Sequence, residues 1–260
     1  MNWDPDVYQL FSDDRSRPFF DLLSAIRPED TAVRRVVDLG CGPGNLTAAL
    51  ARRWPAARIS GLDSDGAMIT KARADHGSVG SITFTQSQIE SWTPDEQDDV
   101  VISNAALQWV PGHRALLGSW LTSLRPGAWI GWQVPGNFAA PSHRLMRGLA
   151  ESPRWSGRLG DVLRHEDVVA GPAEYLSMLQ RAGFAATVWE TSYLHVLTGE
   201  NPVLDWVRGT ALLPILAALD AHEADEFIAT YSTALREAYP ASEHGTVFPF
   251  RRVFAVGRKL

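Results

Sequence analysis

Apolar residues in this chain form short runs that alternate with segments of helical periodicity. The runs that predict strands cover residues 34–39, 58–62, 81–85, 98–103, 128–134, 187–197 and 248–258. Helical segments are predicted between them at 45–54, 66–75, 113–124 and 172–182. Asn45 is the expected N-cap of the first helix, and Ser64 or Asp65 is the expected N-cap of the second. The near-continuous apolar run 98–103 is typical of a strand buried on both faces. This alternation predicts an α/β fold with right-handed βαβ units in a doubly wound, mostly parallel sheet.

Two helical segments interrupt the alternation of strands and helices. Residues 140–165 carry proline, glycine, arginine and tryptophan between short helical pieces, and residues 202–239 are mostly helical. A long helical insertion between the last two strands is expected to cover the carboxyl edge of the sheet. We therefore expect one domain over residues 1–260, with cap insertions at 138–170 and 200–240 that form a lid over the site.

A glycine-rich turn follows the first predicted strand. Residues 36–45 are VVDLGCGPGN, so a run of β-formers leads through Asp38 to Gly40, Gly42 and Gly44. Glycine has no Cβ, so the backbone can turn sharply and approach a ligand closely. A strand, a glycine loop and a helix N-terminus together bind nucleotides in open parallel sheets. The alternative is an ordinary turn, which we disfavour because a second acid, Asp63, ends the next predicted strand.

The charge at this turn favours S-adenosylmethionine over a dinucleotide. The dinucleotide motif is G-x-G-x-x-G and faces a pyrophosphate, whereas these glycines are spaced G-x-G-x-G. The carboxylate of Asp38 would repel pyrophosphate and attract the ammonium group of a bound amino acid. S-adenosylmethionine carries that ammonium and no phosphate. Asp63 can accept both ribose hydroxyls, which supports an adenosine ligand without choosing between the two.

Cys41 is the only cysteine in the chain. It could be a thiol nucleophile or a small residue that packs the loop. We favour packing, because no neighbouring histidine or lysine would lower the pKa of the thiol. A single cysteine allows no intramolecular disulfide and fits a reducing compartment.

Composition and charge narrow the possible partners. The chain has 260 residues, of which 45% are hydrophobic, and a net charge of -6 with its basic residues spread out. Nucleic acid is therefore not expected as a partner, because phosphate contacts need a basic face. The acidic N-terminus has no apolar signal region, and no apolar run approaches membrane-spanning length. We expect a soluble cytoplasmic protein with no membrane contact and no obligate protein partner.

The chain resembles the class I S-adenosylmethionine-dependent methyltransferases, which have a seven-stranded Rossmann-like sheet. The glycine motif at 38–44 supports only that superfamily. More narrowly, the chain is similar to the trans-aconitate 2-methyltransferases almost from end to end. The match includes residues 3–5, 15–18, 103–109, 141–143, 205–207 and 248–252, and the narrower resemblance rests on segment 103–109 and on the terminal segments.

The resemblance implies a set of cofactor contacts. They are Asp38, Gly40, Gly42, Gly44, Asp63, Ser64, Gln88, Ile89 and Asn104. Gln88 departs from the family, which commonly has an aspartate there to hold the adenine amino group, but its amide oxygen can accept the same hydrogen bond. Asn104 could contact the methionine part of the cofactor, contact the acceptor, or be a turn residue.

The resemblance also implies methyl transfer to a carboxylate oxygen. An ionised carboxylate has no proton to lose, so we predict neither a general base nor a metal. An acidic protein that binds a polycarboxylate needs local cations and hydrogen-bond donors. The candidates are Arg15, Arg17, Gln108, Trp109, His143, Arg147, Tyr193, Trp206 and Arg251, with His195, Arg208 and Arg252 as further possibilities.

Each of these candidates could instead be a surface charge or a core aromatic residue. Arg251 and Arg252 are neighbours on a predicted strand, so they point to opposite faces and at most one should enter the pocket. Leu213 stands where some relatives have an arginine before the proline, which removes one possible carboxylate contact.

The leading hypothesis is an S-adenosylmethionine-dependent carboxyl O-methyltransferase that forms the monomethyl ester of trans-aconitate or a similar small polycarboxylic acid. One alternative is a methyltransferase for another small acceptor, and another is a non-catalytic sensor that binds the cofactor. Methylation of nucleic acid bases is disfavoured, because Ala105, Ala106 and Leu107 offer no aromatic ring on which a flipped base could stack.

Overall fold

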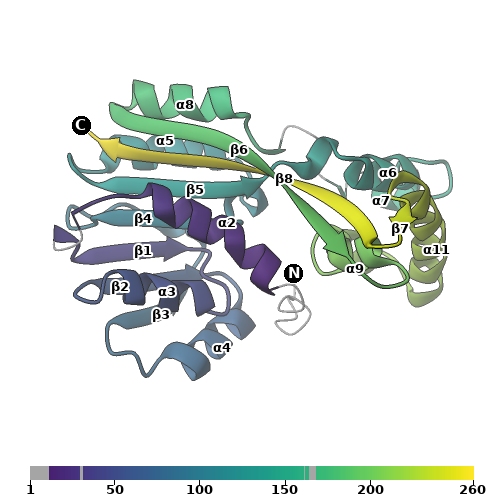
Figure 1. Ribbon diagram of the computed structural model, residues 1–260, viewed down its shortest axis with the longest axis horizontal. Helices are drawn as coiled ribbons and strands as arrows, with labels where there is room; N and C mark the ends of the chain where they lie inside the picture. The colour runs from purple at the N-terminus through teal and green to yellow at the C-terminus, as the bar shows by residue number, and fades with distance from the viewer. Residues whose placement is uncertain (1–11, 30–31, 161, 164–167) are drawn as a thin grey trace.

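The computed structural model describes residues 12–29, 32–160, 162–163 and 168–260 (Figure 1). Its sheet has the strand order β3-β2-β1-β4-β5-β8-β6, in which β8 runs antiparallel to both of its neighbours. The strands are β1 Arg35–Leu39, β2 Arg58–Asp63, β3 Ile82–Gln86, β4 Val100–Asn104, β5 Trp129–Pro135, β6 Phe184–Leu197, β7 Ala241–Ser242 and β8 Gly245–Lys259. All seven predicted strands are present, and the two-residue β7 beside β8 makes an eighth in the described part of the chain.

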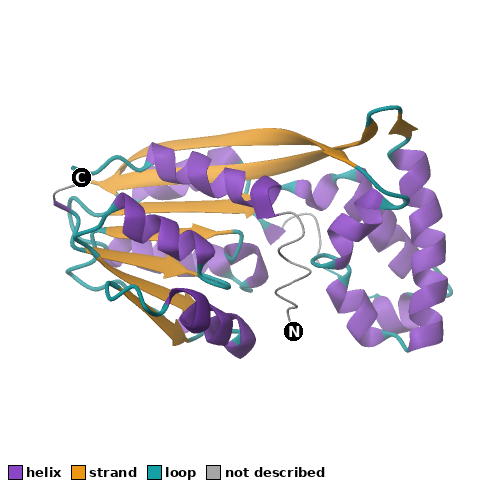
Figure 2. Cartoon of the chain, turned by 60° about the horizontal axis from the view of Figure 1, so that its bottom comes forward, coloured by secondary structure: helices purple, strands orange, loops and turns teal. Residues whose placement is uncertain are grey.

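Helices cover both faces of this sheet (Figure 2). On one face lie α2 Ser12–Ala25, α3 Asn45–Arg53 and α4 Gly66–His76, and on the other lie α5 His113–Ser123 and α8 Pro172–Arg181. Ser64 and Asp65 were the two predicted N-caps of α4, and Asp65 is the one observed. Its side chain accepts hydrogen bonds from the N–H groups of Ala67 and Met68. The predicted cap of α3 was wrong. Gly44, not Asn45, is the N-cap of α3, and no side chain makes a capping hydrogen bond at this helix end.

Helix α2 was not predicted from the sequence. It packs on β5 and β8 and buries Phe19, Leu22 and Leu23, whose helical spacing was the available signal. Its polar beginning and the internal Pro18 obscured that signal. As a result, α2 forms part of the wall beside the carboxyl edge.

A cluster of helices lies beyond one end of the sheet. Its members are α6 Pro141–Ala150, α7 Ser156–Leu159, α9 Pro202–Arg208, α10 Leu213–Ala218 and α11 Ala221–Ala238. They share a separate apolar core around Trp206, Phe227 and Phe248, and we call them the cap. The long strands β6 and β8 continue past the other strands and reach this cap (Figure 1). Both ranges predicted as cap insertions contain these helices.

The position of α6 is fixed by hydrogen bonds inside the cap. The hydroxyl of Tyr231 donates to the carbonyl oxygen of Ser142 at 2.9 Å, and the N–H of Ser142 donates to the hydroxyl of Tyr239 at 3.0 Å. All of these groups are buried. The helix that carries His143 and Arg147 is therefore anchored to α11.

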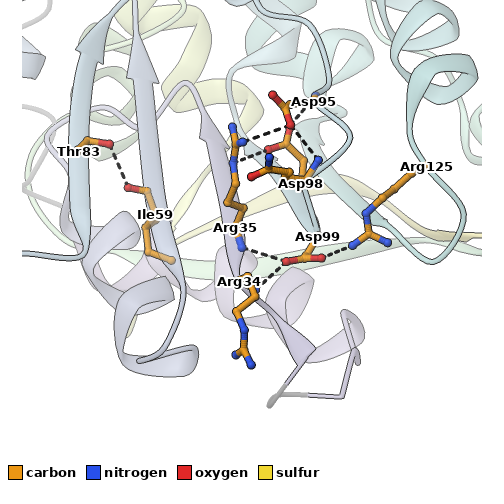
Figure 3. Close-up of polar contacts among 9 residues, drawn as sticks. Arg34, Arg35, Ile59, Thr83, Asp95, Asp98, Asp99 and Arg125 are labelled. Carbon is orange, nitrogen blue, oxygen red and sulfur yellow. Dashed lines mark hydrogen bonds and ion pairs between the residues drawn. The ribbon is translucent and has the colours of Figure 1, made fainter.

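An ion-pair cluster ties β1 to β4 at the amino edge, opposite the cap (Figure 3). The carboxylate of Asp99 accepts the backbone N–H groups of Arg34 and Arg35 and pairs with Arg125. The Nε of Arg35 lies 3.3 Å from the carboxylate of buried Asp98. These contacts fix the register of the strands that end at the site. Within the described ranges, no helix is both long and apolar enough to cross a bilayer.

Candidate active site

A cavity of about 300 Å³ lies at the carboxyl edge of the sheet and extends to the cap. The turns that follow β1, β2, β3, β4 and β5 all contribute to its walls. Strand β1 is the point at which the strand order reverses, and open α/β sheets bind ligands in the crevice there. The cap supplies the opposite wall through α6, α9 and α10.

The glycine loop forms one end of this cavity. Gly40, Gly42 and Gly44 have φ angles of 80°, 54° and 84°, a conformation that side chains disfavour. A Cβ added to Gly40 would lie 2.2 Å from the Cβ of Ala106, and one on Gly44 would lie 2.8 Å from the ring of Phe84. A Cβ on Gly42 would meet no atom within 4 Å. Gly40 and Gly42 line the cavity. Gly44 does not line it, and is instead the N-cap residue of α3.

Asp38 is buried at the end of β1 and lines the cavity. Its Oδ2 accepts a hydrogen bond of 2.6 Å from the hydroxyl of Thr47. The pKa of Asp38 is raised to about 6, mainly by burial; the hydrogen bond from Thr47 lowers it and the nearby charge of Asp63 raises it. A cation beside this carboxylate would offset the cost of its charge. The carboxylate is therefore suited to an ammonium group.

Asp63 ends β2 and holds the glycine loop in place. Its two carboxylate oxygens accept the N–H groups of Gly42 and Asp65, each at 2.9 Å. Burial raises the pKa of Asp63 despite these bonds. Each oxygen keeps a second lone pair, so the side chain can still accept hydroxyl groups from a ligand in the cavity.

The remaining predicted cofactor contacts also line the cavity. They are Ser64, Gln88, Ile89 and Asn104. Gln88 is exposed and precedes the short helix η2 Ile89–Ser91, whereas Ile89 is buried. This places the amide of Gln88 next to an apolar surface, which is the environment that the adenine ring of a cofactor requires.

Two amide side chains on the cavity wall carry buried oxygens. The Oδ1 of Asn104 and the Oε1 of Gln108 have no hydrogen-bond partner in the described structure. Between them, Ala105 adopts a positive φ of 53°, unusual for a residue with a side chain. Buried polar atoms nearly always have partners, so this wall is suited to a polar ligand.

Cys41 packs inside the glycine loop, where its Cβ and Sγ approach Gly61. Burial raises the pKa of the thiol far above its usual range, and the charges of Asp38 and Asp63 add to this effect. A thiol that does not ionise is a poor nucleophile. The structure thus favours the packing interpretation of Cys41.

Helix α6 brings His143 and Arg147 to the cap side of the cavity. The Nη1 of Arg147 donates to the carbonyl oxygen of Phe138 at 2.7 Å. Burial lowers the pKa of His143 to about 4, and the charge of Arg147 contributes to this shift. His143 is therefore neutral near neutral pH, and Arg147 is the cation on this wall. Trp109 and Trp206 line the cavity as predicted substrate candidates.

Several other candidates lie away from the cavity walls. Tyr193 donates a hydrogen bond of 2.5 Å to Asp21 on α2, and the guanidinium carbon of Arg17 lies 5.4 Å from the centre of the Tyr193 ring. Arg208 is exposed. The side chain of Arg15 lies outside the described residues.

His195 was another candidate, and the structure places it in the apolar core of the cap. Its ring is buried, and the ring centre lies 4.6 Å from that of Trp206. His195 is absent from the described cavity walls, although Trp206 lines them. It therefore supports the aromatic wall from behind.

The structure corrects the choice between two neighbouring arginines on β8. Arg251 points away from the cavity, where its Nη2 lies 2.5 Å and its Nε 2.9 Å from Oε2 of Glu190. Arg252 is only 7% exposed and lines the cavity. Alternation along a strand separates the two faces, but only the pairing of β8 with β5 and β6 decides which face meets the site.

Sequence reasoning also missed much of the apolar wall. Phe19 of α2, Met146 of α6 and Phe250 of β8 line the cavity. Their patterns match those of ordinary core residues, so no local signal separates them from the core.

The amino-acid sequence is similar to those of known methyltransferases. Residues 36–127 match a family model described as a methyltransferase domain. Trans-aconitate 2-methyltransferase of Streptomyces avermitilis is 55% identical over 99% of this chain and 97% of its own length. The corresponding protein of Rhodococcus jostii is 52% identical over 98% of this chain and 99% of its own length.

Solved structures share the fold at low sequence identity. The YcgJ protein of Bacillus subtilis has a TM-score of 0.57 and 16% identity, covering 93% of this chain and 97% of its own. An S-adenosylmethionine-dependent methyltransferase of Geobacter sulfurreducens, solved with S-adenosylhomocysteine, has a TM-score of 0.52 and 19% identity over the whole of both chains. Together with the near full-length identity to the relatives, this fold shows that the chain belongs to the trans-aconitate 2-methyltransferase family of class I S-adenosylmethionine-dependent methyltransferases.

Proposed function

We propose that this enzyme transfers the methyl group of S-adenosylmethionine to one carboxylate of trans-aconitate, or of a closely similar small polycarboxylic acid. The products are the monomethyl ester and S-adenosylhomocysteine. The observation that supports this most is the division of charge within one cavity. Asp38 and Asp63 lie at the glycine loop, and Arg147 and Arg252 line the walls formed by the cap and β8.

The acidic end of the cavity fits the cofactor. Asp38 would bind the ammonium group, directly or through a water, and Asp63 would accept the ribose hydroxyls. The amide oxygen of Gln88 would accept the adenine amino group beside Ile89. When bound there, the cofactor supplies a methyl group activated by a positively charged sulfur.

The basic end of the cavity fits a polyanion. A carboxylate of the acceptor is ionised near neutral pH, so the protein has no proton to remove before transfer. Apolar walls such as Phe19 and Phe250 limit the water that would stabilise the separated charges. The main contribution of the protein is then to align the acceptor oxygen with the methyl group.

Asn104 and Gln108 lie on the wall shared by both ends. Their partnerless amide oxygens are placed to receive N–H or O–H donors from bound ligands. Asn104 ends β4 at the same edge as Asp38, so we assign it to the methionine part of the cofactor. We assign Gln108 and Trp109 to the acceptor. An ionised acid has no donor for the amide oxygen of Gln108, so Gln108 would contact it through its amide N–H. The single cysteine supports a cytoplasmic location.

The experiment is an assay with methyl-labelled S-adenosylmethionine and a panel of tricarboxylic, dicarboxylic and monocarboxylic acids. The panel also contains neutral hydroxyl and amine compounds. We expect a base-labile methyl ester, formed fastest on trans-aconitate or another tricarboxylate. Faster turnover of a neutral compound would support another small-molecule methyltransferase, and cofactor binding without turnover would support a sensor. Either result would reject the proposal.

A further inference from the structure

We propose that Arg252 binds a carboxylate of the acceptor that does not react, and thereby selects acids with more than one carboxylate. This inference rests on the proposed function and adds a residue and a selection rule to it. From the sequence we preferred Arg251 as the substrate contact and kept Arg252 only as a further possibility.

The position of Arg252 meets the requirements of a carboxylate-binding residue. The side chain lies on β8, is 7% exposed and lines the cavity. Its guanidinium carbon lies 4.3 Å from the centre of the Phe250 ring, and Phe250 also lines the cavity. Stacking on an aromatic ring orients the flat guanidinium group, and the N–H edge of a guanidinium matches a planar carboxylate in geometry.

The strand pairing holds Arg252 at the edge where the acceptor binds. Arg252 lies opposite Pro135, the last residue of β5, which lines the cavity itself. On its other side it pairs with Thr191 of β6. A strand in the middle of the sheet fixes the backbone of Arg252 more firmly than a loop would. The charge therefore has a defined place relative to the glycine loop.

The chemistry of methyl transfer decides which carboxylate Arg252 binds. The reacting carboxylate loses its negative charge as the ester forms, so a cation held against it would stabilise the starting complex more than the transition state. Such a contact would slow the transfer. A carboxylate that keeps its charge is bound equally well throughout the reaction. Arg252 is therefore assigned to a carboxylate that does not react.

The same reasoning applies to Arg147 on the opposite wall. Among the described residues that line the cavity, Arg147 and Arg252 are the permanent cations. One belongs to helix α6 of the cap and the other to β8 of the sheet. Two such cations match the two non-reacting carboxylates of a tricarboxylic acid, and the third carboxylate faces the cofactor.

The experiment compares Arg252→Gln with Arg251→Gln in the full chain. Arg251 is a matched control because it is the same residue type on the same strand and pairs with Glu190 outside the cavity. The kcat and KM values are measured for trans-aconitate and for dicarboxylates that each lack one of its carboxylates. Thermal unfolding and calorimetric titration with S-adenosylhomocysteine report whether each variant is folded and binds the cofactor.

We expect Arg252→Gln to lower kcat/KM for trans-aconitate about 100-fold or more, mainly through KM, because truncation of a buried charge pair is costly. One dicarboxylate, which lacks the carboxylate that Arg252 binds, should lose less than about fivefold, because its reaction never used that contact. Arg251→Gln should stay within about twofold of the wild type for every acid, as expected for an exposed ion pair.

Equal losses for all acids, or an unchanged preference for the tricarboxylate, would overturn the role of Arg252. If Arg252→Gln does not fold, the same kinetic comparison of acids is made with Arg252→Lys and with the wild type. These two measurements then decide whether Arg252 binds a non-reacting carboxylate. The wild type must then prefer acids with three carboxylates over each dicarboxylate that lacks one of the two non-reacting carboxylates. Failure of the wild type to methylate any acid would instead reject the proposed function itself, and this inference with it.

Discussion

Asp38 and Asp63 place a buried and a half-buried carboxylate beside one cavity, which is unfavourable in the absence of a cation. Burial raises the pKa of both, to about 6 for Asp38. The ionised form of Asp38 is therefore penalised in the folded protein. Because its folded pKa exceeds the unfolded value of 3.8, the penalty is absent at pH below 3.8, grows up to about pH 6 and is complete above it. The protein tolerates this cost at the position where we expect the cofactor ammonium.

The Asp38→Asn variant tests this electrostatic role. We expect it to bind S-adenosylhomocysteine about 100-fold more weakly at pH 7.5, because it loses a buried charge contact. The unliganded variant should gain up to about 3 kcal/mol in free energy of unfolding, since a pKa shift of one unit corresponds to about 1.4 kcal/mol. Calorimetry and urea denaturation measure the two effects. Unchanged affinity would contradict the assignment of the cofactor site.

The wild type should also show a dependence on pH that the variant lacks. Below about pH 6 the free protein must give up a proton from Asp38 before the ammonium can bind. We therefore expect affinity for S-adenosylhomocysteine to fall by up to about tenfold per pH unit between pH 6 and pH 4.5. In Asp38→Asn the affinity should be flat over this range. Parallel slopes for the two proteins would assign the titration to another group.

At the scale of elements, the glycine loop combines two separate requirements. Gly40 has to pass close to Ala106, whereas Gly42 faces open space in the cavity. Both have positive φ, so a side chain strains the backbone at either position. A side chain at position 40 would therefore mainly lower the stability of the fold, whereas a side chain at position 42 would mainly obstruct the ligand.

We expect Gly40→Ala to lower the free energy of unfolding by about 2–4 kcal/mol, because backbone strain adds to a clash with Ala106. Gly42→Ala should cost less, about 1–2 kcal/mol, since only the strain remains. Urea denaturation of both variants, followed by titration with S-adenosylhomocysteine, separates the effects. Similar losses of stability in the two variants would contradict the packing argument.

The same elements show what the sequence could and could not reveal. Buried parallel strands are continuous apolar runs, so β1 and β4 were predictable, as was Asp38 beside the glycines. Helix α2 escaped notice because Pro18 lies inside it, although Phe19 and Leu22 have helical spacing. The choice between Arg251 and Arg252 depends on which face of β8 meets the cavity. That follows from long-range pairing, which local pattern does not encode.

At the scale of the whole molecule, the enzyme consists of a sheet body and a cap with separate apolar cores. The cofactor contacts that we assign all lie on the sheet body. The acceptor contacts come from both, with Arg252 on β8 and Arg147 on α6. Strands β6 and β8 connect the two bodies (Figure 1). Binding of the acid should therefore restrain the cap, whereas binding of the cofactor alone should not.

Hydrogen exchange measures this difference. S-adenosylhomocysteine alone should slow exchange in the glycine loop and α3 and leave α6 and α9 unchanged. Addition of trans-aconitate should then slow exchange in α6 and α9, because the acid joins the cap to the sheet. The product cofactor is used so that no turnover occurs. Protection of the cap by S-adenosylhomocysteine alone would contradict this division of the site.

The burial of Cys41 has a practical consequence for such measurements. Maleimide dyes attack thiolates, and the only native sulfhydryl of the chain is buried and resists ionisation. Cysteines introduced on the surface, for example Val79→Cys beside the sheet and Glu237→Cys on α11, would be labelled without removing the native one. A donor–acceptor fluorophore pair at these positions would follow the distance between cap and sheet in single molecules during turnover.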